Sequence, residues 1–202
     1  NILKYDKKTS PKILSKYYMS DIKNCIYIST ELASGDLKNF ITNIKPNIET
    51  MKLAYFQIFM GLYCIKKYYN IQHNDLHWGN VLYHKIPKKG YIKYIMNGTE
   101  IVIPNIGYLM VIWDFGLSFI PNRINKKSEH KQNRWSDYTR IIHMLSKDDL
   151  QNKDVYEILL QKFEQIFELC QTPEDLLLNY GLVLHNPSIP ESRHSESWSR
   201  PG

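Results

Sequence analysis

Two short segments of the chain carry carboxylates and an amide at spacings that suit phosphoryl transfer. The first, HNDLHWGN at 73–80, holds Asp75 and Asn80 five positions apart, and the second is Asp114-Phe115-Gly116. Phosphoryl transfer needs one carboxylate that orients the attacking hydroxyl and accepts its proton, and a second carboxylate with an amide that hold Mg²⁺ against the phosphates. Oxygen ligands of this kind suit a hard cation. We therefore predict that both segments belong to one site.

The elements around these segments are predicted to place them at strand ends. A helix over 50–69, capped by Thr50, has a buried face that repeats at steps of three and four: Met51, Ala54, Tyr55, Ile58, Leu62 and Ile65. The polar run after it predicts a loop feeding a strand at 81–85. A second strand, 108–113, is fully apolar, is therefore expected to be buried, and runs into Asp114. Between them, Asn97-Gly98 predicts a hairpin with a type I′ turn.

The rest of the chain is predicted to contain both strands and helices. Strands are predicted over 13–19 and 25–31, a surface loop over 121–135, and helices over 36–44, 137–146, 151–171 and 173–180. The longest of these helices is expected to bury one broad face, formed by Val155, Ile158, Leu159, Phe163, Ile166, Phe167 and Cys170.

Composition excludes several classes of protein. The 202 residues are 43% apolar and 23% charged, which is a globular balance. The net charge of +6 is spread along the chain, so no specific nucleic acid is expected as a partner. Cys25, Cys64 and Cys170 lack metal-site spacing and predict reduced thiols. No signal-peptide pattern and no apolar run of membrane-spanning length occur, so we expect an intracellular protein that does not contact a membrane.

The two motifs in this order resemble those of protein kinases, His-x-Asp-x-x-x-x-Asn followed by Asp-Phe-Gly. The resemblance covers about 11–180 and implies an α+β, protein-kinase-like fold with a mainly helical C-lobe, small β-hairpins and the last N-lobe strands. It divides the chain into 1–33, the end of the N-lobe and the hinge, 34–185, the C-lobe, and 186–202, a disordered tail. It implies that Asp75 is the catalytic base, with His73 in the same catalytic group, and that Asn80 and Asp114 are the Mg²⁺ ligands.

The strand at 25–31 and the residues after it resemble the fifth strand and hinge of a kinase. The resemblance places Thr30 at the gatekeeper position and the backbone of Glu31 and Ala33 against the adenine edge of ATP. Asp36 would reach the ribose, and Leu82 would form the floor of the adenine pocket. Taken without the downstream motifs, the same stretch also reads as an ordinary edge strand with a turn.

A closer likeness is to haspin-type kinases and to related kinases of large DNA viruses. It rests on HNDLHWGNVLY and on the predicted hairpin, with Ile103-Pro104 and Gly107, ahead of the second motif. Asp-Phe-Gly stands where haspin has Asp-Tyr-Thr, which favours a viral or divergent relative. The absence of Ala-Pro-Glu after it agrees with this branch. The resemblance implies a Mg²⁺- and ATP-dependent kinase of Ser or Thr in a protein substrate, acting in the host cytoplasm or virion if viral.

Three further positions leave a question about their role open. Asp137 resembles the helix Asp that anchors the catalytic-loop backbone, or is a plain charge at a helix N-terminus. His77 replaces the usual Lys and either approaches the γ-phosphate or packs near Trp78. Asn74 stands where many kinases have an Arg that pairs with an activation-loop phosphate. We therefore expect activity without phosphorylation, although Ser118 and Ser128 are candidate sites.

The N-terminal part departs from a whole kinase. It shows no Gly-rich loop, no VAIK-type Lys and no partner Glu helix, so we expect a fragment with most of the N-lobe absent and poor activity on its own. Two alternatives are a small-molecule phosphotransferase of the aminoglycoside or choline kinase type and a non-catalytic pseudokinase that serves as a binding module. The haspin-like hairpin and the Gly-Asp-Leu after the hinge argue against the first.

Overall fold

The computed structural model describes residues 31–120, 135–146 and 153–185. The chain divides into two units, Asn1–Leu32 and Ala33–Gly202, and every helix and strand below belongs to the second. Several predicted segments lie outside the described residues. They are the strand over 13–19, the strand over 25–31 except its last residue, nearly all of the loop over 121–135, and the tail.

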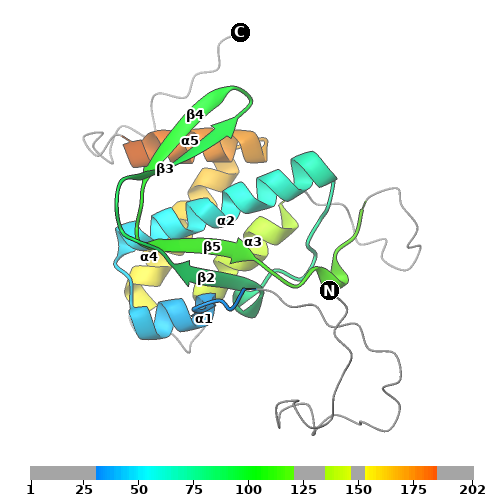
Figure 1. The fold of residues 1–202 in the computed structure, drawn as a ribbon. Coiled ribbons are helices and arrows are strands. Elements are labelled where there is room, and N and C mark those ends of the chain that lie inside the picture. The colour runs from blue at the N-terminus through cyan, green and yellow to red at the C-terminus, as the bar shows by residue number, and fades with distance from the viewer. Residues whose placement is uncertain (1–30, 121–134, 147–152, 186–202) are drawn as a thin grey trace, which may run out of the picture. The chain divides into compact units, whose positions relative to one another are not determined.

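The helix α2, Ile48–Tyr69, is the longest helix in the described part of this unit and carries many of its buried residues. Figure 1 shows it running alongside the strand β5, Tyr108–Ile112, and it also contacts three further helices. These are α3, Ser136–His143, α4, Lys153–Leu169, and α5, Pro173–His185. The predicted face of α2 is buried except for Ile65, which is half-buried. Burial extends to residues outside that face, such as Phe56 and Phe59, because neighbours pack on several sides.

The predicted N-cap of α2 is wrong by three residues. The helix begins at Ile48, and the Oδ1 atom of Asn47 accepts the N–H of Thr50 at 2.8 Å. Asn caps helices at least as well as Thr, so the earlier residue takes the position and Thr50 lies in the first turn. The helix ends at Tyr69, and its C-cap, Asn70, adopts the left-handed conformation with φ of 53° that Asn tolerates.

The first sheet has the order β1-β2-β5 and is antiparallel. It contains β1, Gly35–Asp36, β2, Val81–Lys85, as predicted, and β5. The prediction that the last strand is fully buried is wrong, because Met110 is buried whereas Leu109 is 39% exposed and Trp113, just past the strand, is 45% exposed. Since α2 packs against one face of β5, alternate side chains point away from the helix.

The second sheet is the predicted hairpin. The strands β3, Tyr91–Met96, and β4, Thr99–Pro104, meet at Asn97 and Gly98, whose φ values of 51° and 81° are those of a type I′ turn. β4 packs against α5, and the hairpin lies beside that helix in Figure 1. The turn is also tied to α2, because the Nζ atom of Lys67 donates to Asn97 Oδ1 and to the Tyr63 hydroxyl.

The helices before and after these strands differ from prediction mainly at their ends. The predicted helix over 36–44 begins one residue later, because Asp36 is its N-cap and accepts the N–H of Asn39 at 2.7 Å. It comprises α1, Leu37–Asn39, and a π-helical turn, Phe40–Ile44. The helix predicted over 137–146 is α3 followed by a 3₁₀ turn, Met144–Ser146. The last helix extends beyond residue 180 to His185.

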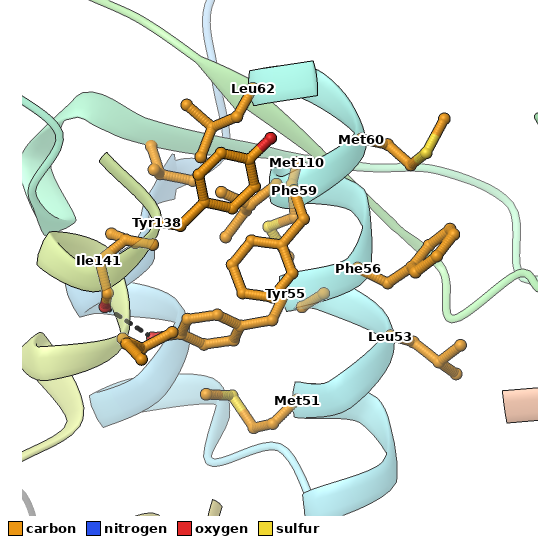
Figure 2. Packing of buried hydrophobic residues seen from close by; sticks show 14 of the residues in the cluster. Met51, Leu53, Tyr55, Phe56, Phe59, Met60, Leu62, Met110, Tyr138 and Ile141 are labelled. Carbon is orange, nitrogen blue, oxygen red and sulfur yellow. Dashed lines mark hydrogen bonds between the residues drawn. The ribbon is translucent and has the colours of Figure 1, made fainter. Parts of the chain in front are cut away.

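Aromatic side chains join α2 to α3 and α4 in the core. Figure 2 shows Tyr55, Phe59 and Leu62 on the side of α2 that faces Tyr138 and Ile141, and the Tyr55 hydroxyl donates to the Ile141 carbonyl at 3.3 Å. The ring of Phe163 from α4 lies 5.1 Å from that of Tyr55 and 5.5 Å from that of Phe59. These contacts fix α3 against α2.

The buried face predicted for α4 is correct for Leu159 and Phe163 but wrong for Ile158, which is 48% exposed. Successive helical residues are rotated by about 100°, so the residue beside Leu159 turns away from α2.

Cys64 and Cys170 are free thiols, as predicted, and burial raises the pKa of both. Cys25 lies outside the described residues. The described part of the chain is a mixed α+β structure, and none of its helices is long and apolar enough to cross a membrane.

The revised cap gives a stability test. Replacing Asn47 by Ala should lower the free energy of unfolding by about 1 kcal/mol, because the Thr50 N–H loses its side-chain acceptor. Thr50→Ala is the matched control and should change it by less than about 0.5 kcal/mol. Urea denaturation of both variants measures the difference, and a larger loss for Thr50→Ala would show that the cap is misassigned.

Candidate active site

The antiparallel pair β2–β5 brings Asn80 and Asp114 to the same end of the sheet. Val81, which follows Asn80, pairs with Ile112, which precedes Asp114 by two residues. The pairing continues one step further, because the N–H of Trp113 donates to the Asn80 carbonyl at 2.9 Å. The strand pairing therefore places the amide and the second carboxylate beside each other.

The Asn80 side chain ties this sheet end to Asp75. Its Nδ2 atom donates to the Asp75 carbonyl at 2.9 Å, and the residue is 6% exposed. A carboxamide that donates through nitrogen presents Oδ1 as the atom able to accept a hydrogen bond or coordinate a cation. Asp75 keeps 36% of its side chain exposed, so its carboxylate is accessible to solvent.

Asp114 adopts a conformation that few residue types accept. Its φ is 58°, in the left-handed region, and its Oδ1 atom accepts the N–H of Gly116 at 3.1 Å. Asp tolerates this region because its short side chain bonds to nearby backbone. The residue is exposed, and it starts a 3₁₀ turn, Phe115–Leu117.

His73 is buried behind the site and has no exposed surface. Its Nε2 atom lies 2.8 Å from the Trp113 carbonyl, which can only accept, so we assign the ring proton to Nε2. The Nδ1 atom is then the acceptor for the Asp75 N–H at 3.4 Å, and the ring packs on Phe115 with centroids 5.1 Å apart. The histidine therefore connects the two motifs and positions Asp75.

Asp137 anchors the backbone of the first motif, which confirms that prediction over the plain helix charge. Its two carboxylate oxygens accept the N–H groups of His73, at 2.9 Å, and Asn74, at 2.8 Å, and the residue is 6% exposed. A buried carboxylate is costly unless hydrogen bonds compensate its charge, and these two bonds do so.

The segment that follows the second motif also bonds the backbone of the loop that contains the first motif. Gln72 and Phe119 exchange backbone hydrogen bonds at 3.0 and 3.1 Å, and the hydroxyl of Ser118 donates to the His73 carbonyl at 3.1 Å. The candidate phosphorylation site Ser118 thus has its hydroxyl engaged in a partly buried contact. Ser128, the other candidate, lies outside the described residues.

His77 lies beside the Asp75 carboxylate. Its Nδ1 atom accepts the N–H of Gly79 at 3.0 Å, which leaves the ring proton on Nε2, and Nε2 lies 3.9 Å from Asp75 Oδ2. Sequence reasoning missed a second neighbour, Arg140, whose Nη1 atom lies 3.7 Å from Asp75 Oδ1. Its helical spacing of three from Asp137, which places both on one face of α3, is the signal that could have indicated it.

The structure brings together only some of the residues predicted to bind the nucleotide. Asp36 and Leu82 are direct neighbours in the β1–β2 register, and Ala33 precedes β1. The Asp36 carboxylate also caps α1, so this side chain has a structural contact besides the predicted one to ribose. Glu31 belongs to the first unit, and Thr30 lies outside the described residues.

The side chains of Asn80 and Asp114 offer only part of the ligands that a cation needs. Within 31–120, 135–146 and 153–185, no three His, Cys, Asp or Glu side chains gather to form a metal site. One amide and one carboxylate fit a Mg²⁺ ion that takes its other ligands from phosphate and water, which is how this cation is usually bound.

Comparison with known proteins finds kinases. The chain is 35% identical over 112 residues to "Probable serine/threonine-protein kinase 380R" of Invertebrate iridescent virus 6, an alignment that covers 54% of this chain and 19% of that protein. It is 31% identical over 110 residues to "Putative serine/threonine-protein kinase 019R" of Frog virus 3 (isolate Goorha), with coverage of 54% and 12%.

Identity to the serine/threonine-protein kinase haspin of Mus musculus is 33% over 93 residues, 46% of this chain and 12% of haspin. The chain thus spans less than a fifth of each of these curated relatives. No protein-family model matches it. The resemblance to haspin and to viral kinases is confirmed.

The anchor role of Asp137 predicts a stability effect. Asp137→Asn should lower the free energy of unfolding by about 2 kcal/mol or more, because the new NH₂ group faces a backbone donor in a buried place. Asp175→Asn is the matched control: its carboxylate also accepts two backbone N–H groups, at 3.2 and 3.0 Å, but water can reach it. Its effect should stay below about 1 kcal/mol. Denaturant titration compares them, and equal effects contradict the anchor.

Proposed function

We propose that this chain is the C-lobe part of a haspin-like protein kinase that transfers the γ-phosphate of ATP to Ser or Thr hydroxyls, with Mg²⁺ as cofactor. The observation that carries the proposal is the double attachment of Asn80. Its side chain bonds the Asp75 backbone and its own carbonyl bonds the residue before Asp114, so the three groups that phosphoryl transfer requires share one rigid frame.

In the proposed reaction, Asp75 orients the substrate hydroxyl and accepts its proton as the hydroxyl oxygen attacks the γ-phosphorus and ADP leaves. Its half-exposed carboxylate suits this task. Asn80 Oδ1 and the Asp114 carboxylate would hold a Mg²⁺ ion, which would supply positive charge to the phosphate oxygens. His73 does no chemistry in this scheme, because its ring is buried, and instead sets the position of Asp75.

The names of the relatives support protein substrates over small molecules, since all three relatives described above are called serine/threonine-protein kinases. Adenine binding by the backbone of Glu31 and Ala33, with Thr30 as gatekeeper, Asp36 at the ribose and Leu82 beneath the base, completes the proposal. The register that sets Asp36 opposite Leu82 supports the last two roles.

The base role of Asp75 predicts a selective loss. In the full-length protein, Asp75→Asn should lower kcat by about 10²–10⁴-fold, because the amide cannot accept the proton, while ATP affinity changes little. Glu100→Gln on the β3–β4 hairpin, where the carboxylate pairs with Lys93, is a control that should leave kcat unchanged. Steady-state phosphate transfer and nucleotide titration measure the two quantities. Near-normal turnover in Asp75→Asn contradicts the base assignment.

The two proposed cation ligands, Asp114 and Asn80, should contribute unequally to Mg²⁺-dependent ATP affinity. Asp114→Ala should reduce Mg²⁺-dependent ATP affinity more than Asn80→Ala, because a carboxylate contributes a full charge to the cation and an amide only a dipole. Calorimetric titration with ATP, with and without Mg²⁺, separates the metal-dependent part. Equal and small effects at both positions would instead favour a pseudokinase.

A further inference from the structure

Arg140 contacts the catalytic loop at two points. Its Nη1 atom donates to the Asn74 carbonyl at 2.6 Å and lies 3.7 Å from Asp75 Oδ1. It reaches there from α3, 66 positions further along the chain than Asn74. One guanidinium nitrogen thus contacts both the peptide group that precedes Asp75 and the carboxylate itself.

The residue that Arg140 contacts has a backbone conformation that needs support. Asn74 has φ of 64°, in the left-handed region, which costs free energy for any residue with a Cβ atom and persists where the surroundings hold it. Asp137 accepts the N–H of Asn74, and Arg140 donates to its carbonyl. The helix α3 therefore holds both backbone polar groups of Asn74 through two side chains three positions apart, on one helix face.

The carboxylate of Asp75 is also flanked on both sides. Arg140 lies next to Oδ1, and His77 lies 3.9 Å from Oδ2. An exposed ion pair by itself contributes little to stability, and Arg140 is 42% exposed. Its effect should instead be on orientation, because fixing the backbone before Asp75 and one carboxylate oxygen restricts rotation of the proton-accepting group.

We propose that Arg140 is a positioning residue that holds Asp75 in its reactive orientation by fixing the left-handed Asn74 backbone from α3. The catalytic consequence rests on the proposed kinase function, whereas the effect on the loop backbone does not.

The test uses the full-length protein with Arg140→Met, Arg140→Lys and, as control on the same helix, His143→Gln. His143 is exposed and pairs with Glu164 of α4 at 3.2 Å. Two quantities are measured: hydrogen exchange of backbone amides across 72–80, and kcat and KM for ATP.

Arg140→Met should raise amide exchange in this loop by about tenfold, since the bond from Arg140 to the Asn74 carbonyl is lost while the loop's bonds to Ser136 and Asp137 of α3 remain. It should lower kcat by about tenfold to a hundredfold with KM for ATP within about twofold of the original. Arg140→Lys should recover part of both effects, because the ammonium keeps the charge but lacks the planar, forked donor set. His143→Gln should alter neither.

Unchanged loop exchange in Arg140→Met overturns the proposal, and so does faster exchange with an unaltered kcat. Equal loosening in His143→Gln also overturns it, because the effect would then be a general weakening of α3. If the unmodified protein transfers no phosphate, the proposed function fails, and the exchange measurement still decides whether Arg140 holds the loop.

Discussion

The structure depends most on one buried carboxylate. Asp137 accepts two consecutive backbone N–H groups of the loop that carries Asp75. If the loop left α3, the buried Asp137 carboxylate would lose the hydrogen bonds that compensate its charge. The helix itself is held by the core, because Tyr138 and Ile141 pack against α2 and Tyr55 bonds the Ile141 carbonyl (Figure 2). Burial of aromatic side chains thereby determines where the backbone around Asp75 lies.

A second constraint comes from the strand pair β2–β5. Its register fixes Asn80 against Trp113, and the Asn80 side chain then bonds the loop that Asp137 anchors. His73 closes this arrangement by bonding the Trp113 carbonyl from the buried side. Helix, strands and loop therefore restrain one another, and the proposed phosphoryl transfer would rely on this preorganisation.

Local patterns in the sequence predict most of the described elements, because helical periodicity, strand composition and the Asn-Gly turn are short-range signals. They misplace the cap of α2, since Asn47 and Thr50 are both good caps, and they overestimate the burial of Ile158, since neighbouring apolar residues look alike in a sequence. Motif spacing indicates Asp75 for the same local reason. The contact of Arg140 joins positions 66 apart, and the sequence offers only the helical spacing of three between Asp137 and Arg140 as a signal for it.

The most direct test of the central claim, that Asn80 and Asp114 hold a cation with a bound nucleotide, is paramagnetic relaxation with Mn²⁺, which shares the oxygen-ligand preference of Mg²⁺. The full-length protein is titrated with Mn²⁺ in the presence of ATP while its NMR signals are followed. We predict that the Asn80 side-chain amide and the Asp114 backbone amide broaden first, and those of the β3–β4 hairpin last. Broadening at the hairpin without broadening at Asn80 and Asp114 would contradict the claim.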